Sequence, residues 1–308
     1  MRNTPTFRIL AILLSVPLAI GCSPRKDSGD PQKGRNPSQT EIGRIEFSGL
    51  STPESVLHDP QSDVYLVSNI NGSPFGEGGK GFISRIGPEA EIQGLKWIQG
   101  GLGEVKLSAP KGMALVGDVL YVTDVTAVRK FDRKTGKPLG EIAIEGASFL
   151  NDLAAAPDGT VYVSDTGLGK GFASTGTDAV YAIGASGEVK ALAKGKELGQ
   201  PNGLLAEGDS VLMVGWESGA LSRVGRDGKI TEIAKLPKNQ LDGLVRDSKG
   251  DYLVSSWAGS CVYRVTPDGK VSTAVPDLNA PADLGYDEKR GRLLIPFFNE
   301  NKVLVLSP

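Results

Sequence analysis

The chain of 308 residues contains few of the residue types that build many catalytic and structural sites. It has 1 His and 2 Cys, so a His-rich zinc site and a disulfide framework are excluded. Lys and Arg number 34 against 36 Asp and Glu, and the net charge is -2. Domains that bind nucleic acid usually carry a basic excess, so we expect no nucleic-acid partner.

The N-terminal segment, residues 1–21, has the pattern of a secretory signal peptide. Two arginines precede the apolar run 9–20, which is shorter than the roughly 20 residues that a membrane span needs. The small residues before Cys22 resemble a bacterial lipobox, in which the cysteine becomes lipidated; a cleaved signal with an incidental cysteine is the alternative. Since Ser23 rather than Asp follows, we expect a lipid anchor at the periplasmic face of the outer membrane and no other membrane contact.

Residues 22–41 are polar and contain no aliphatic side chain, so this segment predicts a flexible tether before a domain over 42–308. If Cys22 is lipidated, Cys261 is the remaining thiol. It lies in a strand-like segment, which predicts a buried and unreactive side chain.

Six short segments recur along the rest of the chain, each at the start of a run of β-forming residues. They are centred on Glu54, Lys111, Asn151, Asn202, Asp242 and Ala282, at intervals of 40 to 57 residues. Further β-rich runs follow each one, and several are separated by Ser-Gly or Asp-Gly pairs that are typical of hairpin turns. Four short antiparallel strands repeated in this way predict the blades of a β-propeller.

We therefore predict an all-β fold, a six-bladed β-propeller that is monomeric. The last repeat ends after its third strand, and a strand-like segment, 43–50, precedes the first repeat. We expect this N-terminal strand to complete the last blade and close the ring, because closure protects the edge strands.

The strand order predicts where the recurring positions lie. Each stands at the start of the innermost strand of its blade, so all six should surround one mouth of the central channel. The Gly-rich segments 69–80 and 166–178 both connect the second and third strands of their blades, which places them on the same face. We expect them to form a mobile rim; neutral variation of surface loops is the alternative.

Four of the recurring side chains offer oxygen atoms: Glu54, Asn151, Asn202 and Asp242. Two carboxylates and two amides around a narrow channel suit a hard cation such as Ca²⁺. Without a cation the two carboxylates would repel each other. Two alternatives remain: Lys111 neutralises the carboxylates, or the Asn-Gly and Asp-Gly pairs simply form turns.

The segments resemble the senescence marker protein/gluconolactonase (regucalcin-like) family, to which the paraoxonases are related. The resemblance rests on four segments in order: Pro53-Glu54-Ser55, Asn151-Asp152, Pro201-Asn202-Gly203-Leu204 and Asp242-Gly243. It implies a six-bladed propeller with one divalent cation in the channel, usually Ca²⁺ although other divalent cations are possible. By the family pattern Glu54, Asn202 and Asp242 would bind this cation, and Asn151 would bind it directly or through water.

The resemblance also implies an activity, the hydrolysis of a small-molecule lactone or related ester. The cation would polarise the lactone carbonyl, Asp242 would be the general base for the attacking water, and Asn151 would position the substrate. Sugar-lactone members of the family carry Arg where this chain has Phe149, and Lys111 would supply a substrate-binding charge from another side.

Four aromatic residues lie at or near the ends of β-rich runs that point toward the same mouth: Trp216, Trp257, Phe297 and Phe298. They would bind substrate as an apolar wall, unless they belong to the core between the blades. His58, four residues after Glu54, lies in a turn-like segment and is expected to be exposed rather than catalytic.

Two other functions remain open. A non-catalytic propeller would bind a protein, glycan or small ligand and keep calcium for rigidity, since this fold hosts many functions. A condensing enzyme that resembles strictosidine synthase is less favoured, because it would need a catalytic Glu in the channel.

Overall fold

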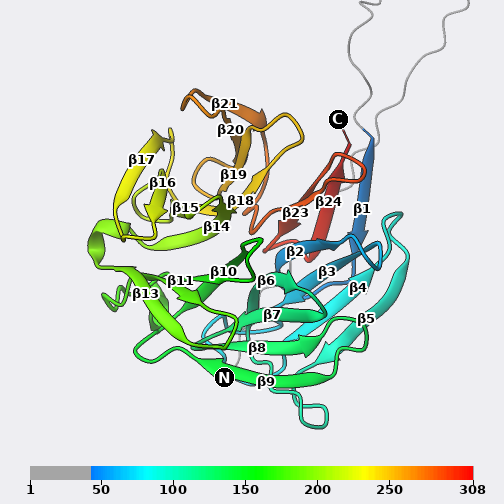
Figure 1. The fold of residues 1–308 in the computed structure, drawn as a ribbon. Helices are drawn as coiled ribbons and strands as arrows, with labels where there is room; N and C mark the ends of the chain where they lie inside the picture. The colour runs from blue at the N-terminus through cyan, green and yellow to red at the C-terminus, as the bar shows by residue number, and fades with distance from the viewer. Residues whose placement is uncertain (1–42, 308) are drawn as a thin grey trace, which may run out of the picture. The chain divides into compact units, whose positions relative to one another are not determined.

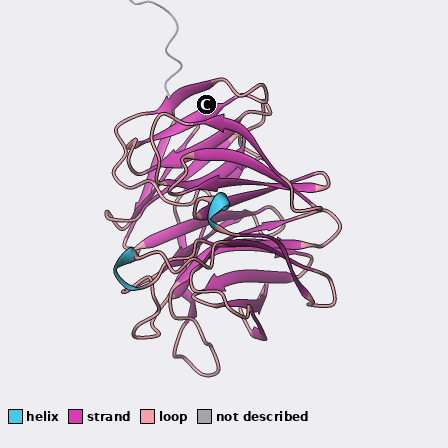
Figure 2. Cartoon of the chain, turned by 90° about the vertical axis from the view of Figure 1, so that its left-hand side faces the viewer, coloured by secondary structure: helices cyan, strands magenta, loops and turns pink. Residues whose placement is uncertain are grey.

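The computed structural model describes residues 43–307, in which strands account for nearly all regular structure (Figure 2). Helix is confined to two short 3-10 turns, η1 (Lys170–Phe172) and η2 (Lys196–Leu198). In this part of the chain no helix has the length and apolar character needed to cross a bilayer. The predicted signal peptide, Cys22 and the tether 22–41 lie outside the described residues.

Residues 43–307 form six antiparallel sheets of four strands, arranged as the blades of a propeller (Figure 1), so the predicted six-bladed β-propeller is confirmed. The innermost strands are β2 (Pro53–Asp59), β6 (Pro110–Val116), β10 (Leu150–Ala155), β14 (Pro201–Glu207), β18 (Leu241–Arg246) and β22 (Gly285–Asp287). The second strands are β3 (Val64–Asn69), β7 (Val119–Asp124), β11 (Val161–Asp165), β15 (Ser210–Gly215), β19 (Tyr252–Ser256) and β23 (Arg292–Phe297). The third strands are β4 (Phe82–Ile86), β8 (Ala127–Asp132), β12 (Ala179–Ile183), β16 (Ala220–Gly225), β20 (Cys261–Val265) and β24 (Lys302–Leu306). The outer strands are β5 (Ile92–Gln99), β9 (Pro138–Ala143), β13 (Val189–Lys194), β17 (Ile230–Lys235), β21 (Val271–Val275) and β1 (Arg44–Ser48).

The two ends of the described chain meet in one blade. Strand β1 pairs with β24 along its whole length, from Arg44 opposite Leu306 to Ser48 opposite Lys302 (Figure 1). The innermost strands β22 and β2 are also neighbours, so each innermost strand contacts two others. The sixth sheet therefore combines the N-terminal strand with the last three strands of the chain.

The hydrophobic core is divided among the interfaces between blades. Alternate residues of a strand point to opposite faces of its sheet. In β3, Tyr65 and Val67 pack against the sixth blade, whereas Val64 and Leu66 pack against the second. Both faces of the middle strands are therefore buried, while outer strands such as β9 and β13 remain largely exposed.

Five of the six innermost strands change register at the position that recurs in the sequence, and β22 does not. The pairing of β2 with β3 shifts between Pro53 and Val56, and equivalent shifts occur in the next four blades. A bulge of this kind turns a side chain away from the regular pleat. It directs the recurring side chains toward the mouth of the channel.

The glycines that follow two recurring positions serve the packing of the innermost strands. A Cβ atom on Gly203 would lie 2.2 Å from the carbonyl oxygen of Asp242, and one on Gly243 would lie 2.1 Å from the amide nitrogen of Leu284. These pairs lie inside β14 and β18. The alternative that Asn202-Gly203 and Asp242-Gly243 form turns is wrong, because glycine here permits the close approach of the next strand.

Closure by β1 predicts a measurable stability effect at Phe47, which is buried between the first and sixth blades. Replacing Phe47 by Ala should lower the free energy of unfolding by about 3–5 kcal/mol, because a cavity opens at this seam. Ser48→Ala is the matched control on the exposed face of β1 and should change stability by less than about 0.5 kcal/mol. Urea denaturation measures both; equal effects of the two variants would contradict a sealing role for β1.

Candidate functional site

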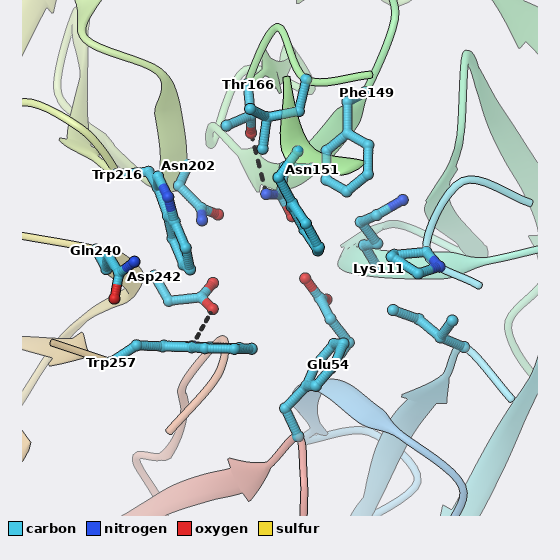
Figure 3. A pocket seen from close by; sticks show the side chains of 15 residues that line it. Glu54, Lys111, Phe149, Asn151, Thr166, Asn202, Trp216, Gln240, Asp242 and Trp257 are labelled. Carbon is cyan, nitrogen blue, oxygen red and sulfur yellow. Dashed lines mark hydrogen bonds between the residues drawn. The ribbon is translucent and has the colours of Figure 1, made fainter. Parts of the chain in front are cut away.

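Five of the six recurring side chains come together in one pocket of about 340 Å³ at a mouth of the channel. They are Glu54, Lys111, Asn151, Asn202 and Asp242 (Figure 3). The sixth, Ala282, is buried but does not line the pocket. The tertiary structure thus gathers residues that are separated by up to 188 positions in the sequence. This gathering is what the predicted strand order required.

The two Gly-rich loops contribute to the rim of this pocket. Ile70 and Pro74 come from the loop after β3, and Leu168 and Phe172 from the loop after β11. Lys170 forms a salt bridge with Glu77 across the two loops. Their position on the face of the recurring residues agrees with the prediction.

The polar floor of the pocket presents oxygen atoms toward its centre. The Nδ2 atom of Asn151 donates to Thr166 Oγ1 at 3.0 Å, and Thr166 in turn donates to the carbonyl oxygen of Pro201 at 2.8 Å. This chain fixes the Asn151 amide with its oxygen facing the pocket (Figure 3). Both Asn151 and Asn202 are buried.

Three oxygens of this floor have no hydrogen-bond partner. Among residues 43–307, four buried side-chain polar atoms are unpaired, and three of them are Glu54 Oε2, Asn202 Oδ1 and Asp242 Oδ1. Leaving a buried acceptor unpaired costs about 1–3 kcal/mol. Three unpaired acceptor oxygens in one pocket are an arrangement that would suit a positively charged group.

Asp242 is held by a neighbouring indole. Trp257 Nε1 donates to Asp242 Oδ2 at 2.8 Å, which leaves the other carboxylate oxygen directed into the pocket (Figure 3). Burial, together with the nearby charge of Asp283, raises the pKa of Asp242 to about 8, although the bond from Trp257 opposes this shift. Burial also holds the pKa of Glu54 well above its usual value, and the charges of Asp242 and Asp283 act in the same direction.

Lys111 does not pair directly with either carboxylate. Its ammonium lies 4.2 Å from the centroid of the Phe149 ring and donates to the carbonyl oxygen of Ala109 at 3.3 Å. Burial lowers the pKa of Lys111 to about 8, against the opposing influence of Glu54. Lys111 thus lies beside Phe149, the position that is Arg in sugar-lactone members of the family that this chain resembles.

Two buried carboxylates behind the floor were not among the predicted site residues. Asp152 accepts the amide of Leu204 at 2.7 Å, and Asp283 accepts the hydroxyl of Ser55 at 2.5 Å. Burial raises the pKa of Asp283 to about 7 and also raises that of Asp152. Their signal in the sequence is that each directly follows a recurring position, but only the packed innermost strands show that they lie behind the floor.

Trp216 and Trp257 line the pocket and are half-buried, as expected for a wall rather than for the core between blades. Phe298, one residue after β23, lines it as well, whereas Phe297 is buried in the core and does not line the pocket. Cys261, the predicted inert thiol, is buried.

The expectation for His58 is wrong. It lies near the end of β2 and is buried rather than exposed. Its Nε2 atom is 3.3 Å from Asp63 and its Nδ1 atom 3.5 Å from Asp287, so the ring lies between two carboxylates. It borders a different pocket, of about 470 Å³, at the other end of the innermost strands.

The donor set at the floor fits a hard cation. Within the described part of the chain no group of three or more His, Cys, Asp or Glu side chains is placed to hold a metal ion. Two carboxylates and two amide oxygens are the ligand types that Ca²⁺ takes, with water or substrate completing its shell. Of the four side chains that the sequence indicated, three carry the unpaired oxygens.

Comparisons with known proteins agree with this architecture. A family model described as the SMP-30/Gluconolactonase/LRE-like region matches residues 103–282, more than half of the chain. A gluconolactonase from Xanthomonas campestris is 18% identical, with a TM-score of 0.68 over 87% of this chain and 90% of that one. A protein proposed to be a gluconolactonase is also 18% identical, with a TM-score of 0.67 over 87% of this chain and 93% of that one.

A streptogramin B lyase has the same fold at 12% identity, with a TM-score of 0.62 over 86% of this chain and 97% of that one. No curated protein matches the chain in sequence. At these identities the structural likeness shows the fold alone.

The raised pKa values predict that the protein without cation loses stability as pH rises. Unfolded carboxyls titrate near pH 4, whereas Asp242 and Glu54 retain protons to higher pH when folded. Between about pH 5 and 8 the native state still holds the Asp242 proton that the unfolded state has already lost, so the free energy of unfolding falls by up to about 1.4 kcal/mol per pH unit through this group. Glu54 contributes in the same direction. Thermal unfolding in chelator measures this fall, and added Ca²⁺ should reduce it.

Asp242→Asn should also reduce the fall, by removing one of the titrating groups. Asp209→Asn, at a highly exposed carboxyl, is the matched control and should leave the pH dependence unchanged. Stability that rises with pH over this range in chelator would contradict burial of these carboxyls in protonated form.

Proposed function

Since the chain belongs to the SMP-30/gluconolactonase/LRE-like family, we propose that it is a calcium-dependent hydrolase of lactones or related esters. The observation that carries the proposal is the cluster of unpaired oxygens from Glu54, Asn202 and Asp242 in one pocket. Calcium would be held by these three side chains and Asn151. When bound, it would supply a Lewis acid that polarises the substrate carbonyl.

Asp242 is the proposed general base. One of its oxygens is committed to Trp257, while the other faces the pocket without a partner. It takes a proton from the attacking water as the water oxygen bonds to the carbonyl carbon. The ring carbon–oxygen bond then breaks, the proton passes to the leaving alkoxide, and the product is a hydroxy acid.

Two further side chains would orient the substrate. Asn151 is held by Thr166 and so presents its amide in one direction. Lys111 brings a positive charge that no described carboxylate pairs with, and this charge would favour the developing carboxylate of the product. We also propose that the protein is exported and lipidated at Cys22, as its sequence predicts. The substrate would then meet the enzyme at the cell envelope.

The test of the hydrolase is turnover of a panel of short- and long-chain γ- and δ-lactones by the calcium-loaded full chain. Asp242→Asn and Glu54→Gln should each lower kcat/KM by at least about 100-fold, because each removes a charged oxygen and retains side-chain volume. Chelator should abolish wild-type turnover and Ca²⁺ should restore it, while Asp209→Asn should behave as wild type.

Elemental analysis, combined with the lactone panel, separates the hydrolase from the non-catalytic alternative. Tightly bound metal without turnover of any lactone would favour a scaffold that keeps calcium for rigidity. Protein that binds no divalent cation would overturn both.

Lys111→Met tests the role of the buried charge. Methionine retains the apolar stem against Phe149 but removes the ammonium, so kcat/KM should fall about tenfold or more, as for loss of one charge-assisted contact. Steady-state kinetics on the best lactone measures this change, with circular dichroism as the folding control. Unchanged kinetics would assign Lys111 a structural role.

A further inference from the structure

Aromatic side chains stand on two sides of the polar floor. Figure 3 shows Trp216 and Trp257 on one side and Phe149 on the other, with Glu54 and Asp242 between them. A ligand whose carbonyl meets the floor must therefore extend between aromatic surfaces to leave the pocket.

The first aromatic cluster comes from three consecutive blades. Trp216, Trp257 and Phe298 each follow the second strand of their blade by one residue. The ring centroids of Trp216 and Trp257 are 5.4 Å apart, and those of Trp257 and Phe298 are 5.0 Å apart. Since Trp257 also donates to Asp242, this wall is fixed relative to the floor.

The second aromatic cluster joins the floor to the rim. Phe75, in the loop after β3, lies 5.3 Å from Phe149 and 5.4 Å from Phe172, measured between ring centroids. Phe172 is 57% exposed and adopts a φ of 60°, a conformation that is costly for a bulky residue. The exposed ring of Phe172 therefore continues the apolar surface of Phe149 and Phe75 to the edge of the pocket.

The polar groups above the floor are few. Eight of the fifteen lining residues are apolar or aromatic. The Thr166 hydroxyl is bonded to Asn151 and Pro201, and the Trp257 N–H to Asp242. The Gln240 amide and the Trp216 indole N–H remain as polar groups in the wall. A polyhydroxylated lactone has more hydroxyls than these two groups can bond, so the others would lose water without gaining partners, at about 1–3 kcal/mol for each unpaired group.

We propose that this site takes a lactone or ester with a hydrophobic alkyl or aryl group, which the two aromatic clusters hold, rather than a sugar lactone. The inference rests on the proposed hydrolase for the reaction, but the recognition of a hydrophobic carbonyl compound can be measured separately.

The first arm of the test is turnover. The γ-lactones from γ-valerolactone to γ-undecalactone should show kcat/KM rising about threefold for each methylene that the clusters bury, and glucono-1,5-lactone should be the poorest substrate. Phe298→Ala and Phe172→Ala should reduce this increment. Leu139→Ala, at an exposed position on β9, is the matched control and should leave it unchanged.

The second arm measures binding without chemistry. 2-Alkylcyclopentanones keep the carbonyl and the chain but contain no ester bond. Of the 3 tryptophans, Trp216 and Trp257 line the pocket and Trp97 lies on β5, so Trp97→Phe protein reports the pocket through its fluorescence. The Kd of these ketones should fall about threefold per methylene from ethyl to heptyl.

The outcomes separate the two proposals. Turnover of glucono-1,5-lactone above all alkyl lactones, with no chain-length dependence in either arm, overturns the hydrophobic substrate while the hydrolase stands. Ketone binding that strengthens with chain length, without turnover of any lactone, supports hydrophobic recognition and overturns the hydrolase. Ketones that do not bind at all overturn the inference.

Discussion

The two carboxylates of Glu54 and Asp242 are buried in one pocket, each with an oxygen that has no hydrogen-bond partner in the described chain. Such an arrangement is unfavourable by itself, as the raised pKa of both groups reflects. It persists because the inter-blade cores and the close approach of the innermost strands fix the positions of these side chains. The stability of six packed interfaces therefore supports a polar centre that prefers either protons or a cation.

Repetition of one structural device explains why the site is where it is. The same register shift begins the innermost strand of blade after blade and turns one side chain to the channel mouth. The residue one step later instead faces the next innermost strand, where Gly203 and Gly243 permit contact and Asp152 accepts a backbone amide. Positions that face the pocket and positions that pack the innermost strands are thus adjacent in the sequence.

The polar floor and the apolar walls are coupled through Trp257. Its N–H fixes Asp242, while its ring packs against Trp216 and Phe298. On the opposite side the ammonium of Lys111 lies over the face of the Phe149 ring, and Phe149 also contacts Phe75. In the proposed reaction, chemistry at the carbonyl and recognition of the rest of the substrate would therefore depend on the same side chains.

Period, spacing and hairpin pairs in the sequence determined the six blades, and strand order determined that the recurring residues share one mouth, because adjacent strands must alternate in direction. The residue types at four of these positions indicated that carboxylate and amide oxygens would gather there. The sequence did not show that Asn202-Gly203 and Asp242-Gly243 lie within strands, since the same pairs also form turns. Nor did it show that His58 is buried between Asp63 and Asp287, that Asp283 lies behind the floor, or that Phe75 and Phe172 meet across two loops. Apart from His58 with Asp63, these contacts join residues far apart in the chain, and only the packing of one blade against the next decides which of them touch.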